Sequence, residues 1–414
     1  MDNNWFEQHF INEVKPALDR HSGAGAGSAP SAKLNIAYGT TPPSNTSKLW
    51  VKTSKAEGVH LSSLIDLQIA RKLGTTLPVA TAMMQTAVIG TKIYLLGGYT
   101  SSYTDYTPAI YCFDTETRTI TTLSITLPTG KHSMGSAVIG TKVYLLGGNP
   151  STEYTKIYCF DTEASIITTL GATLPYSMYS MCYGLVGTKV YLLGGIKGGQ
   201  ATNAVCSFDT DTETVTTLGS PLPDTVYDAG SATIGTKIYV FGGANNTNPS
   251  GFYEVRVFDT DTLSVTKSSG ILPYKFRSFR CAVHGNKVYL FGGYKDTETY
   301  YVYCFDAETF TITLLPTGLS KNLRYVAVGT VGTTAYVFGG IDSSSNVSNT
   351  IYSFDMGVDL PKKHLAIMTD IATNQVELAP GLPVGVTSVY KGNSDNIGEP
   401  VEAYLYKDGA WTLI

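Results

Sequence analysis

Short apolar runs separated by polar turns recur along most of the chain, and six of these runs end in a pair of glycines. The Gly-Gly pairs lie at 97–98, 147–148, 194–195, 242–243, 292–293 and 339–340, at steps of 50, 47, 48, 50 and 47 residues. A Phe-Asp pair follows each of them, at 113–114, 160–161, 208–209, 258–259, 305–306 and 354–355. Such a regular period indicates six copies of one supersecondary unit.

The unit at residues 129–175 shows the elements that this pattern predicts. Apolar segments at 136–139 and 143–146 flank the tight turn 140–142, and segments at 157–160 and 166–170 flank the turn 161–163. The pattern therefore predicts four short antiparallel strands per unit. One such sheet cannot bury both of its apolar faces, whereas radial stacking of the copies buries them.

This combination of an apolar strand, Gly-Gly, Tyr and Phe-Asp resembles the kelch repeat over about residues 65–355. The resemblance implies an all-β, six-bladed kelch-type β-propeller with a binding role. One feature differs from the family, because the outer strand is rich in Thr, Ile and Val where kelch repeats usually carry Trp. A Leu-Pro pair precedes five units, at 77–78, 127–128, 174–175, 222–223 and 272–273, and we assign Leu315-Pro316 to the sixth.

The two ends of the repeat region predict how the ring closes. The sixth unit departs from the pattern after Asp355, so its outer strand is missing. Residues 69–78 match the outer strand of the second unit at 166–175. We therefore expect an N-terminal strand near 67–73 to complete the last blade, which would leave no exposed sheet edge at the junction.

Four regions follow from these patterns: an amphipathic helix and flexible linker at 1–33, a connector at 34–64, the propeller at 65–358 and a small C-terminal β region at 359–414. Residues 2–20 carry the helix pattern, and the β region ends in two strands joined at Asp408-Gly409. Segments 34–64 and 360–414 resemble connector pieces of tail and fibre proteins of tailed phages and prophages of gut bacteria. This resemblance implies a virion protein, displayed as a homo-oligomer, that contacts other virion proteins through residues 2–20.

Composition excludes several classes of protein. The net charge of −4 and the pI of about 5.9 argue against nucleic-acid binding. No apolar stretch reaches the roughly 18 residues that span a membrane. Residues 1–20 lack the apolar central run of a signal peptide. We expect synthesis in the host bacterial cytoplasm, with a purely cytoplasmic protein as the alternative location. The six cysteines are expected to be free thiols, since four of them occupy similar positions in different blades.

Candidate binding residues lie in the loops that differ between repeats. The turns Gly-Thr-Lys and Asp-Thr-Glu are nearly uniform, so one face of the disc suits a structural role, whereas the loops after Gly-Gly and after Leu-Pro vary. Variable loops on a rigid scaffold commonly carry function, and tyrosine-rich loops supply contact area at low entropic cost. The candidate ligand-binding residues are Tyr99, Tyr103, Tyr106, His132, Tyr154, Tyr176, Tyr179, Tyr227, Asp228, Tyr253, Lys275, Arg277, Tyr294, Tyr300, Arg324 and Tyr325.

No cofactor or metal site is expected. The run Asp209-x-Asp211-x-Glu213 lacks the glycine and the distal glutamate of a calcium loop. A glycosidase pair remains open among Asp105, Glu153, Asp228, Asp296 and Glu298, although their spacing singles out no pair. The sequence favours a non-catalytic protein that binds a bacterial surface glycan or protein. The alternatives are a virion decoration protein, a cytosolic interaction scaffold and a polysaccharide-processing enzyme.

Overall fold

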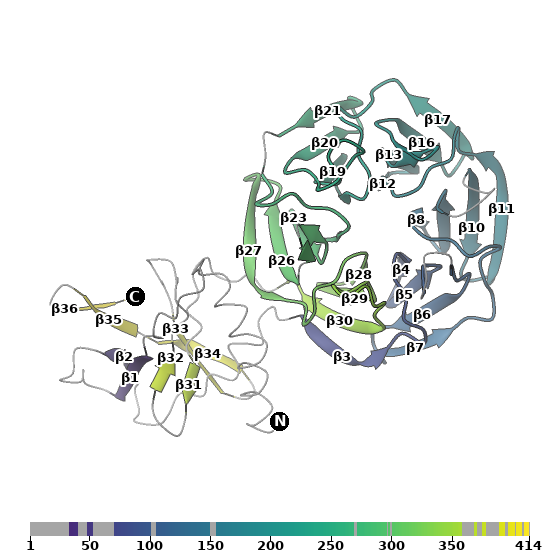
Figure 1. The fold of residues 1–414 in the computed structure, drawn as a ribbon. Coiled ribbons are helices and arrows are strands. Elements are labelled where there is room, and N and C mark those ends of the chain that lie inside the picture. Colours follow the sequence, from purple (N-terminus) through teal and green to yellow (C-terminus); the bar gives the residue numbers. More distant parts are fainter. Residues whose placement is uncertain are drawn as a thin grey trace. The chain divides into compact units, whose positions relative to one another are not determined.

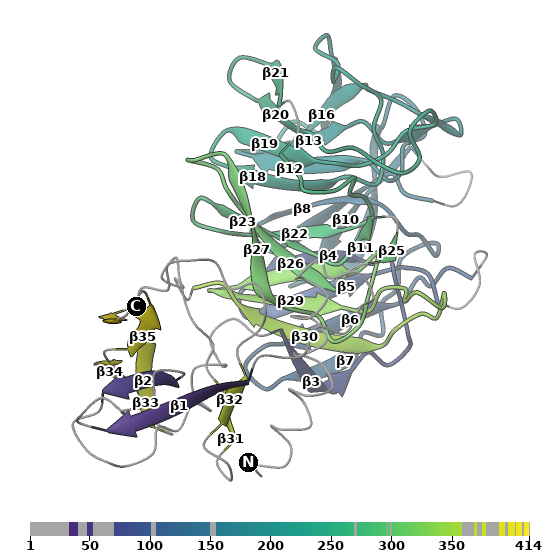
Figure 2. The ribbon, with the colours of Figure 1, turned by 60° about the vertical axis from the view of Figure 1, so that its left-hand side comes forward.

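Six four-stranded antiparallel sheets are arranged around a central axis in the computed structural model (Figure 1, with a second view in Figure 2). The structure describes residues 70–357 except 101–104, 150–154, 269–270, 296 and 299, and outside this span only the backbone of short strands. The all-β, six-bladed propeller expected from the sequence is confirmed. The described residues contain no helix, and thus no helix that could cross a membrane.

Each blade runs from an inner to an outer strand. Blade 1 comprises β4 (Gln85–Ile89), β5 (Lys92–Leu96), β6 (Ile110–Asp114) and β7 (Thr119–Thr122). Blade 2 comprises β8 (Gly135–Ile139), β9 (Lys142–Leu146), β10 (Lys156–Asp161) and β11 (Ile166–Thr173). Blade 3 comprises β12 (Cys182–Val186), β13 (Lys189–Leu193), β16 (Val205–Asp209) and β17 (Thr214–Leu218), with the loop hairpin β14 (Ile196–Lys197) and β15 (Gln200–Ala201).

The other three blades repeat this order. Blade 4 comprises β18 (Gly230–Ile234), β19 (Lys237–Phe241), β20 (Val255–Asp259) and β21 (Ser264–Lys267). Blade 5 comprises β22 (Arg280–His284), β23 (Lys287–Phe291), β26 (Tyr301–Asp306) and β27 (Thr311–Gly318), with the hairpin β24 (Tyr294–Lys295) and β25 (Thr297–Glu298). Blade 6 comprises β28 (Ala327–Val331), β29 (Thr334–Phe338), β30 (Thr350–Asp355) and β3 (Arg71–Thr76).

The ring closes between chain segments that are far apart in sequence. Strand β3 pairs antiparallel with β30, with Arg71 opposite Ser353 and Thr76 opposite Thr350. This strand overlaps the range near 67–73 expected from the sequence but begins at Arg71, and residues 67–69 lie outside the described part of the chain. The last blade therefore takes three strands from one end of the propeller and one from the other.

The Phe-Asp pair has two separate structural roles. The phenylalanines, for example Phe113 and Phe354, are fully buried between neighbouring blades. In blade 1 the Asp114 carboxylate accepts hydrogen bonds from the backbone N–H groups of Glu116 and Thr117, each 3.0 Å long. These backbone donors lower the pKa of Asp114. The pair thus anchors a blade on one side and closes a turn on the other.

The structure corrects the assignment of Leu315-Pro316 to the sixth Leu-Pro position. In the other blades this leucine is at most 5% exposed, and its N–H donates to a loop carbonyl, as Leu127 does to Pro108 at 2.9 Å. In the last repeat Leu319 makes the equivalent bond, to Tyr300 at 2.7 Å, and is 2% exposed. Strand β27 is long, so Leu315 lies within it and the equivalent pair is Leu319-Ser320.

The chain segments on either side of the propeller form a unit of their own, comprising 1–69 and 358–414. One six-stranded sheet contains, in order, β31 (Met368–Asp370), β32 (Gln375–Glu377), β1 (Lys33–Gly39), β2 (Lys48–Lys52), β35 (Ala403–Lys407) and β36 (Ala410–Leu413). Strands β33 (Val389–Asn393) and β34 (Asn396–Val401) pair separately. The connector and the C-terminal region thus share one sheet, which the sequence did not predict. The helix expected at 2–20 lies outside the described residues.

Candidate binding face

The Gly-Gly pairs hold neighbouring blades together at the edge of the loop face, the face formed by the loops after Gly-Gly and after Leu-Pro. In blade 6, Gly339 has a φ of 61°, and a Cβ there would lie 1.9 Å from the Thr81 carbonyl oxygen of blade 1. The N–H of Gly340 donates to that same carbonyl at 3.2 Å. The other five pairs repeat this contact with the next blade. Only glycine permits both the backbone conformation and the close approach.

Six residues, one per blade, form a closed ring of backbone hydrogen bonds on the loop face. Each has a left-handed φ between 52° and 62° and lies six residues after the buried leucine of its Leu-Pro position. Each N–H donates to the carbonyl of the equivalent residue in the preceding blade, at 2.7–3.3 Å, and Met83 closes the ring onto Tyr325. We call these six residues the floor of the loop face: Met83, Ser133, Ser180, Asp228, Ser278 and Tyr325.

The residue that precedes each floor position forms a rim around it. Each rim residue makes an isolated antiparallel bridge to the residue that follows the Gly-Gly pair, as Tyr227 does to Ala244 and Arg277 does to Tyr294. Floor and rim are therefore fixed by backbone bonds. In blade order the rim residues are Ala82, His132, Tyr179, Tyr227, Arg277 and Arg324.

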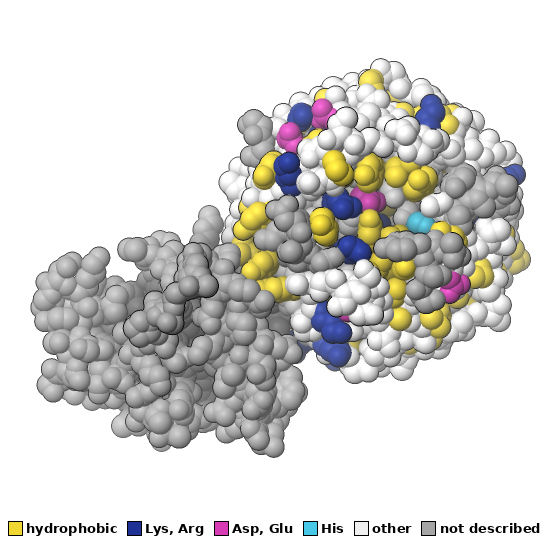
Figure 3. Space-filling model, viewed as in Figure 1, with side chains coloured by type: hydrophobic (Ala, Val, Ile, Leu, Met, Phe, Trp, Pro, Cys, Tyr) yellow, Lys and Arg dark blue, Asp and Glu magenta, His cyan; other side chains and the backbone are white. Residues whose placement is uncertain are grey.

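The rim differs from one side to the other. Blades 2–4 contribute aromatic side chains, and blades 5 and 6 contribute two arginines. The Arg277 guanidinium carbon lies 4.6 Å from the centre of the Tyr294 ring, and that of Arg324 lies 6.0 Å from the centre of the Tyr325 ring. Stacking of this kind holds a guanidinium in a fixed orientation. Basic and hydrophobic side chains also gather near the middle of the face seen in Figure 3.

One hydrogen bond and one aromatic contact shape the interior of this face. The Tyr325 hydroxyl donates to Asp228 Oδ2 at 2.9 Å, which joins blade 6 to blade 4. Burial, and secondly the Asp228 charge, raise the pKa of Tyr325, so its hydroxyl stays protonated. His132 stacks against Tyr106 with ring centres 5.0 Å apart, and burial lowers its pKa to about 4. His132 is therefore a neutral, packed side chain at pH 7.

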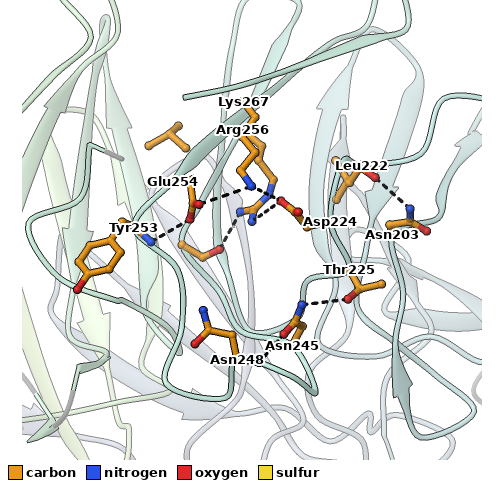
Figure 4. A network of polar contacts seen from close by, with 12 residues as sticks. Asn203, Leu222, Asp224, Thr225, Asn245, Asn248, Tyr253, Glu254, Arg256 and Lys267 are labelled. Atoms are coloured by element: carbon orange, nitrogen blue, oxygen red, sulfur yellow. Dashed lines mark hydrogen bonds and ion pairs between the residues drawn. The ribbon is translucent and has the colours of Figure 1, made fainter. Parts of the chain in front are cut away.

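A polar network fixes the loop at 244–254 beside the rim (Figure 4). Arg256 is fully buried and donates to the Gly242 carbonyl at 3.1 Å and to Asp224 Oδ2 at 3.2 Å, while Lys267 reaches the same Asp224 oxygen at 2.7 Å. The guanidinium lies over the Phe252 ring at 4.8 Å. The loop thus has a rigid base, from which Tyr253 projects with 44% of its surface exposed.

A cavity of about 400 Å³ lies inside the ring of inner strands. Gln85 of blade 1 donates through Nε2 to Ser136 Oγ at 2.8 Å and to the Tyr183 hydroxyl of blade 3. Gln85 Oε1 is buried without a hydrogen-bond partner among the described residues. Arg280 is the one charged side chain in the described lining. The bond between Gln85 and Tyr183 thus links two non-adjacent blades inside the ring.

The structure brings together only part of the candidate set. Seven of the candidates belong to the floor and rim: His132, Tyr179, Tyr227, Asp228, Arg277, Arg324 and Tyr325. Tyr106 and Tyr294 stack on rim residues, whereas Tyr99 is only 4% exposed and packs against Ala82 and Ile341, so it serves the core. Tyr176, Tyr253, Lys275 and Tyr300 belong to loops outside the floor and rim. Tyr103 and Tyr154 lie outside the described residues.

The sequence did not point to the floor serines, nor to Gln85 and Tyr183 in the lining of the cavity. The sequence does contain a pattern that marks the floor, because every member lies six residues after the buried leucine at the Leu-Pro position. Among the described carboxylates open as a glycosidase pair, Asp105 bonds Thr100 in its own loop and Asp228 bonds Tyr325. The described residues hold no cluster of three potential metal ligands, and all six cysteines are free.

Comparison with known proteins identifies the repeat. The sequence-family model of the KLHDC2/KLHL20/DRC7 Kelch-repeats domain matches residues 82–225 and 228–371. These two matches cover more than half of the chain. The chain belongs to the Kelch-repeat family. This kelch propeller is also similar to the solved structure titled "Structure of YjhT", with a TM-score of 0.57 and 15% identity over 67% of this chain and 96% of that one. At that identity the likeness shows the fold alone. No curated protein matches the chain.

Proposed function

We propose that this kelch propeller is a non-catalytic binding protein that recognises a glycan or protein on the bacterial surface through its loop face. The observation that carries the proposal is the rim, where aromatic and arginine side chains surround a polar floor held by six backbone hydrogen bonds. Preorganised aromatic and arginine side chains are the groups that dominate binding energy in recognition surfaces. Family membership supports a binding or interaction role.

We further propose that the protein is carried on a phage or prophage particle. The resemblance of the segments flanking the propeller to tail and fibre connectors supports this location. The two flanking segments share one six-stranded sheet and form a unit of their own. Such a unit is suited to attachment. In this arrangement the attachment unit holds the particle, and the propeller carries the recognition surface.

The test is binding of the purified protein to cells of gut bacterial isolates. We expect saturable binding that falls about tenfold or more when Tyr179 and Tyr227 are both replaced by Ser, since each rim aromatic is expected to contribute at least about 1 kcal/mol. The matched control is Ile166→Ser, which changes an exposed apolar side chain on the outer strand β11. If folded protein binds no isolate, or if both variants lose binding equally, the proposal is wrong.

A further inference from the structure

Charge is divided between the two faces of the propeller. In and beside the uniform turns, the described residues include twelve carboxylates and six basic side chains. The carboxylates are Asp114, Glu116, Asp161, Glu163, Asp209, Asp211, Glu213, Asp259, Asp261, Asp306, Glu308 and Asp355. The basic residues are Lys92, Arg118, Lys142, Lys189, Lys237 and Lys287. This turn face is therefore acidic although the whole chain is only weakly charged.

The loop face has the opposite balance. Among the residues whose side chains the structure describes, its loops and adjoining strand ends hold ten basic side chains and five carboxylates. The basic residues are Lys131, Lys156, Lys197, Arg256, Lys267, Lys275, Arg277, Arg280, Lys321 and Arg324, and the acidic ones are Asp105, Asp224, Asp228, Glu254 and Asp342. Asp224 and Glu254 pair with cations of their own blade, and Asp228 accepts from Tyr325. Among these described side chains the balance of charge on the loop face is therefore positive, which favours an acidic ligand.

The rim concentrates that charge beside aromatic side chains. Arg277 and Arg324 occupy equivalent positions in adjacent blades, and the backbone bond from Tyr325 N–H to the Ser278 carbonyl, 2.8 Å long, ties those blades together. Tyr227 occupies the same position in the blade that precedes Arg277. A cationic half and an aromatic half of one rim thus meet between blades 4 and 5.

Resting on the proposed binding role, we propose that the loop face recognises an acidic glycan whose sugar units carry carboxylates. Arginine matches a carboxylate with two parallel N–H···O bonds, and stacking of Arg277 on Tyr294 holds its guanidinium ready for such contact. Tyr179 and Tyr227 offer ring surface against which the apolar face of a sugar packs. A uronic acid unit combines both features, and a polymer of such units would engage the wider positive face.

The experiment compares oligogalacturonate with its fully methyl-esterified form, which keeps the sugar rings and removes the charge. We expect the protein to bind the acid at least about tenfold more tightly, because the ester has no carboxylate to accept charge-assisted hydrogen bonds from the arginines. Raising the ionic strength should weaken binding of the acid and leave the ester unaffected. Equal binding of acid and ester would overturn the proposal.

A pair of charge-matched variants tests the location. Arg277→Gln with Arg324→Gln should lower the affinity for oligogalacturonate about tenfold or more. Lys92→Gln with Lys142→Gln, the same change in net charge on the turn face, should leave the affinity unchanged within about twofold, since exposed charges beyond a Debye length are screened. Equal losses in the two variants would contradict the assigned site, provided that both unfold at the wild-type temperature.

Binding to bacterial cells, measured in parallel, separates the two proposals. If cells are bound equally by the wild type and the arginine double variant, the acidic-glycan proposal fails and the surface-binding function stands. If no cells are bound while oligogalacturonate is, the chemistry of the rim is supported and the bacterial target is wrong. Cell binding that falls with the arginines and with added salt supports both.

Discussion

At the scale of single residues, the glycines with a positive φ fall into two groups with different requirements. Turn glycines such as Gly90 have a positive φ of 59° but no atom within 4 Å of the place a Cβ would occupy. Gly339 has a nearly equal φ of 61°, and its Cβ would collide with the Thr81 carbonyl in blade 1. The first kind of glycine serves a hairpin turn, and the second serves the contact between blades.

This difference predicts unequal costs for the same substitution. Gly90→Ala should lower the free energy of unfolding by about 1 kcal/mol, the cost of placing alanine in the left-handed region. Gly339→Ala adds overpacking against a carbonyl that the ring holds in place, so its total cost should reach about 3 kcal/mol or more. Thermal and urea unfolding of the two variants measure the difference. Similar losses would show that the blade contact adapts to a Cβ.

At the scale of elements, blade 4 departs from its neighbours in its third strand. The position of Arg256 in β20 is occupied by Tyr111, Tyr158, Tyr303 and Tyr352 in four other blades. Arg256 is fully buried and is compensated by Asp224, the Gly242 carbonyl and the Phe252 ring. Arg256 links the strand to the loop at 244–254 through the Phe252 ring, so a core position in this blade fixes a loop on the loop face.

Replacing Arg256 alone should lower the free energy of unfolding strongly, whereas replacing Arg256 and Asp224 together should lower it much less. Arg256→Leu should lower the free energy of unfolding by about 3 kcal/mol, because the Gly242 carbonyl loses its donor and Asp224 keeps only Lys267. Arg256→Tyr with Asp224→Thr copies Tyr158 and Thr129 of blade 2 and should recover more than half of that loss. Urea unfolding checks both, and a double variant no better than Arg256→Leu would contradict this account.

At the scale of the whole molecule, stability depends on closure between blade 6 and β3. Each blade buries its faces against two neighbours, so a missing strand would affect the two blades that meet there. Strand β3 contributes Leu73 to the core between blades 6 and 1, and Thr75 Oγ1 donates to the Arg118 carbonyl of blade 1. The strand therefore joins blades 6 and 1 on the outside of the ring.

Truncation tests this role of β3. The chain 70–357, which contains every described propeller strand, should unfold in one cooperative transition. The chain 77–357, which lacks β3, should unfold at a markedly lower temperature and aggregate, since the β30 edge and the core around Leu73 become exposed. Calorimetry and light scattering on the two chains measure this. Matching transitions would show that three strands suffice in blade 6.

Local and periodic features of the fold were determined by the sequence itself. The number of blades, the positions of most strands and the uniform turns follow from Gly-Gly and Phe-Asp, because each motif acts through bonds within one blade or a repeated contact with the next. The loop face could also be recognised, since Tyr227, Arg277 and Arg324 lie in loops that vary between repeats. The individual roles of those residues could not.

Only the tertiary structure decided which loop residues meet. The floor, the rim and the contact between Tyr325 and Asp228 join residues from different blades, and Asp228 and Tyr325 are 97 positions apart. It also decided that Tyr99 belongs to the core and that Leu319, not Leu315, occupies the sixth leucine position. The physical reason is the same in each case: these contacts form between blades, where the neighbours depend on ring closure and not on the pattern within a repeat.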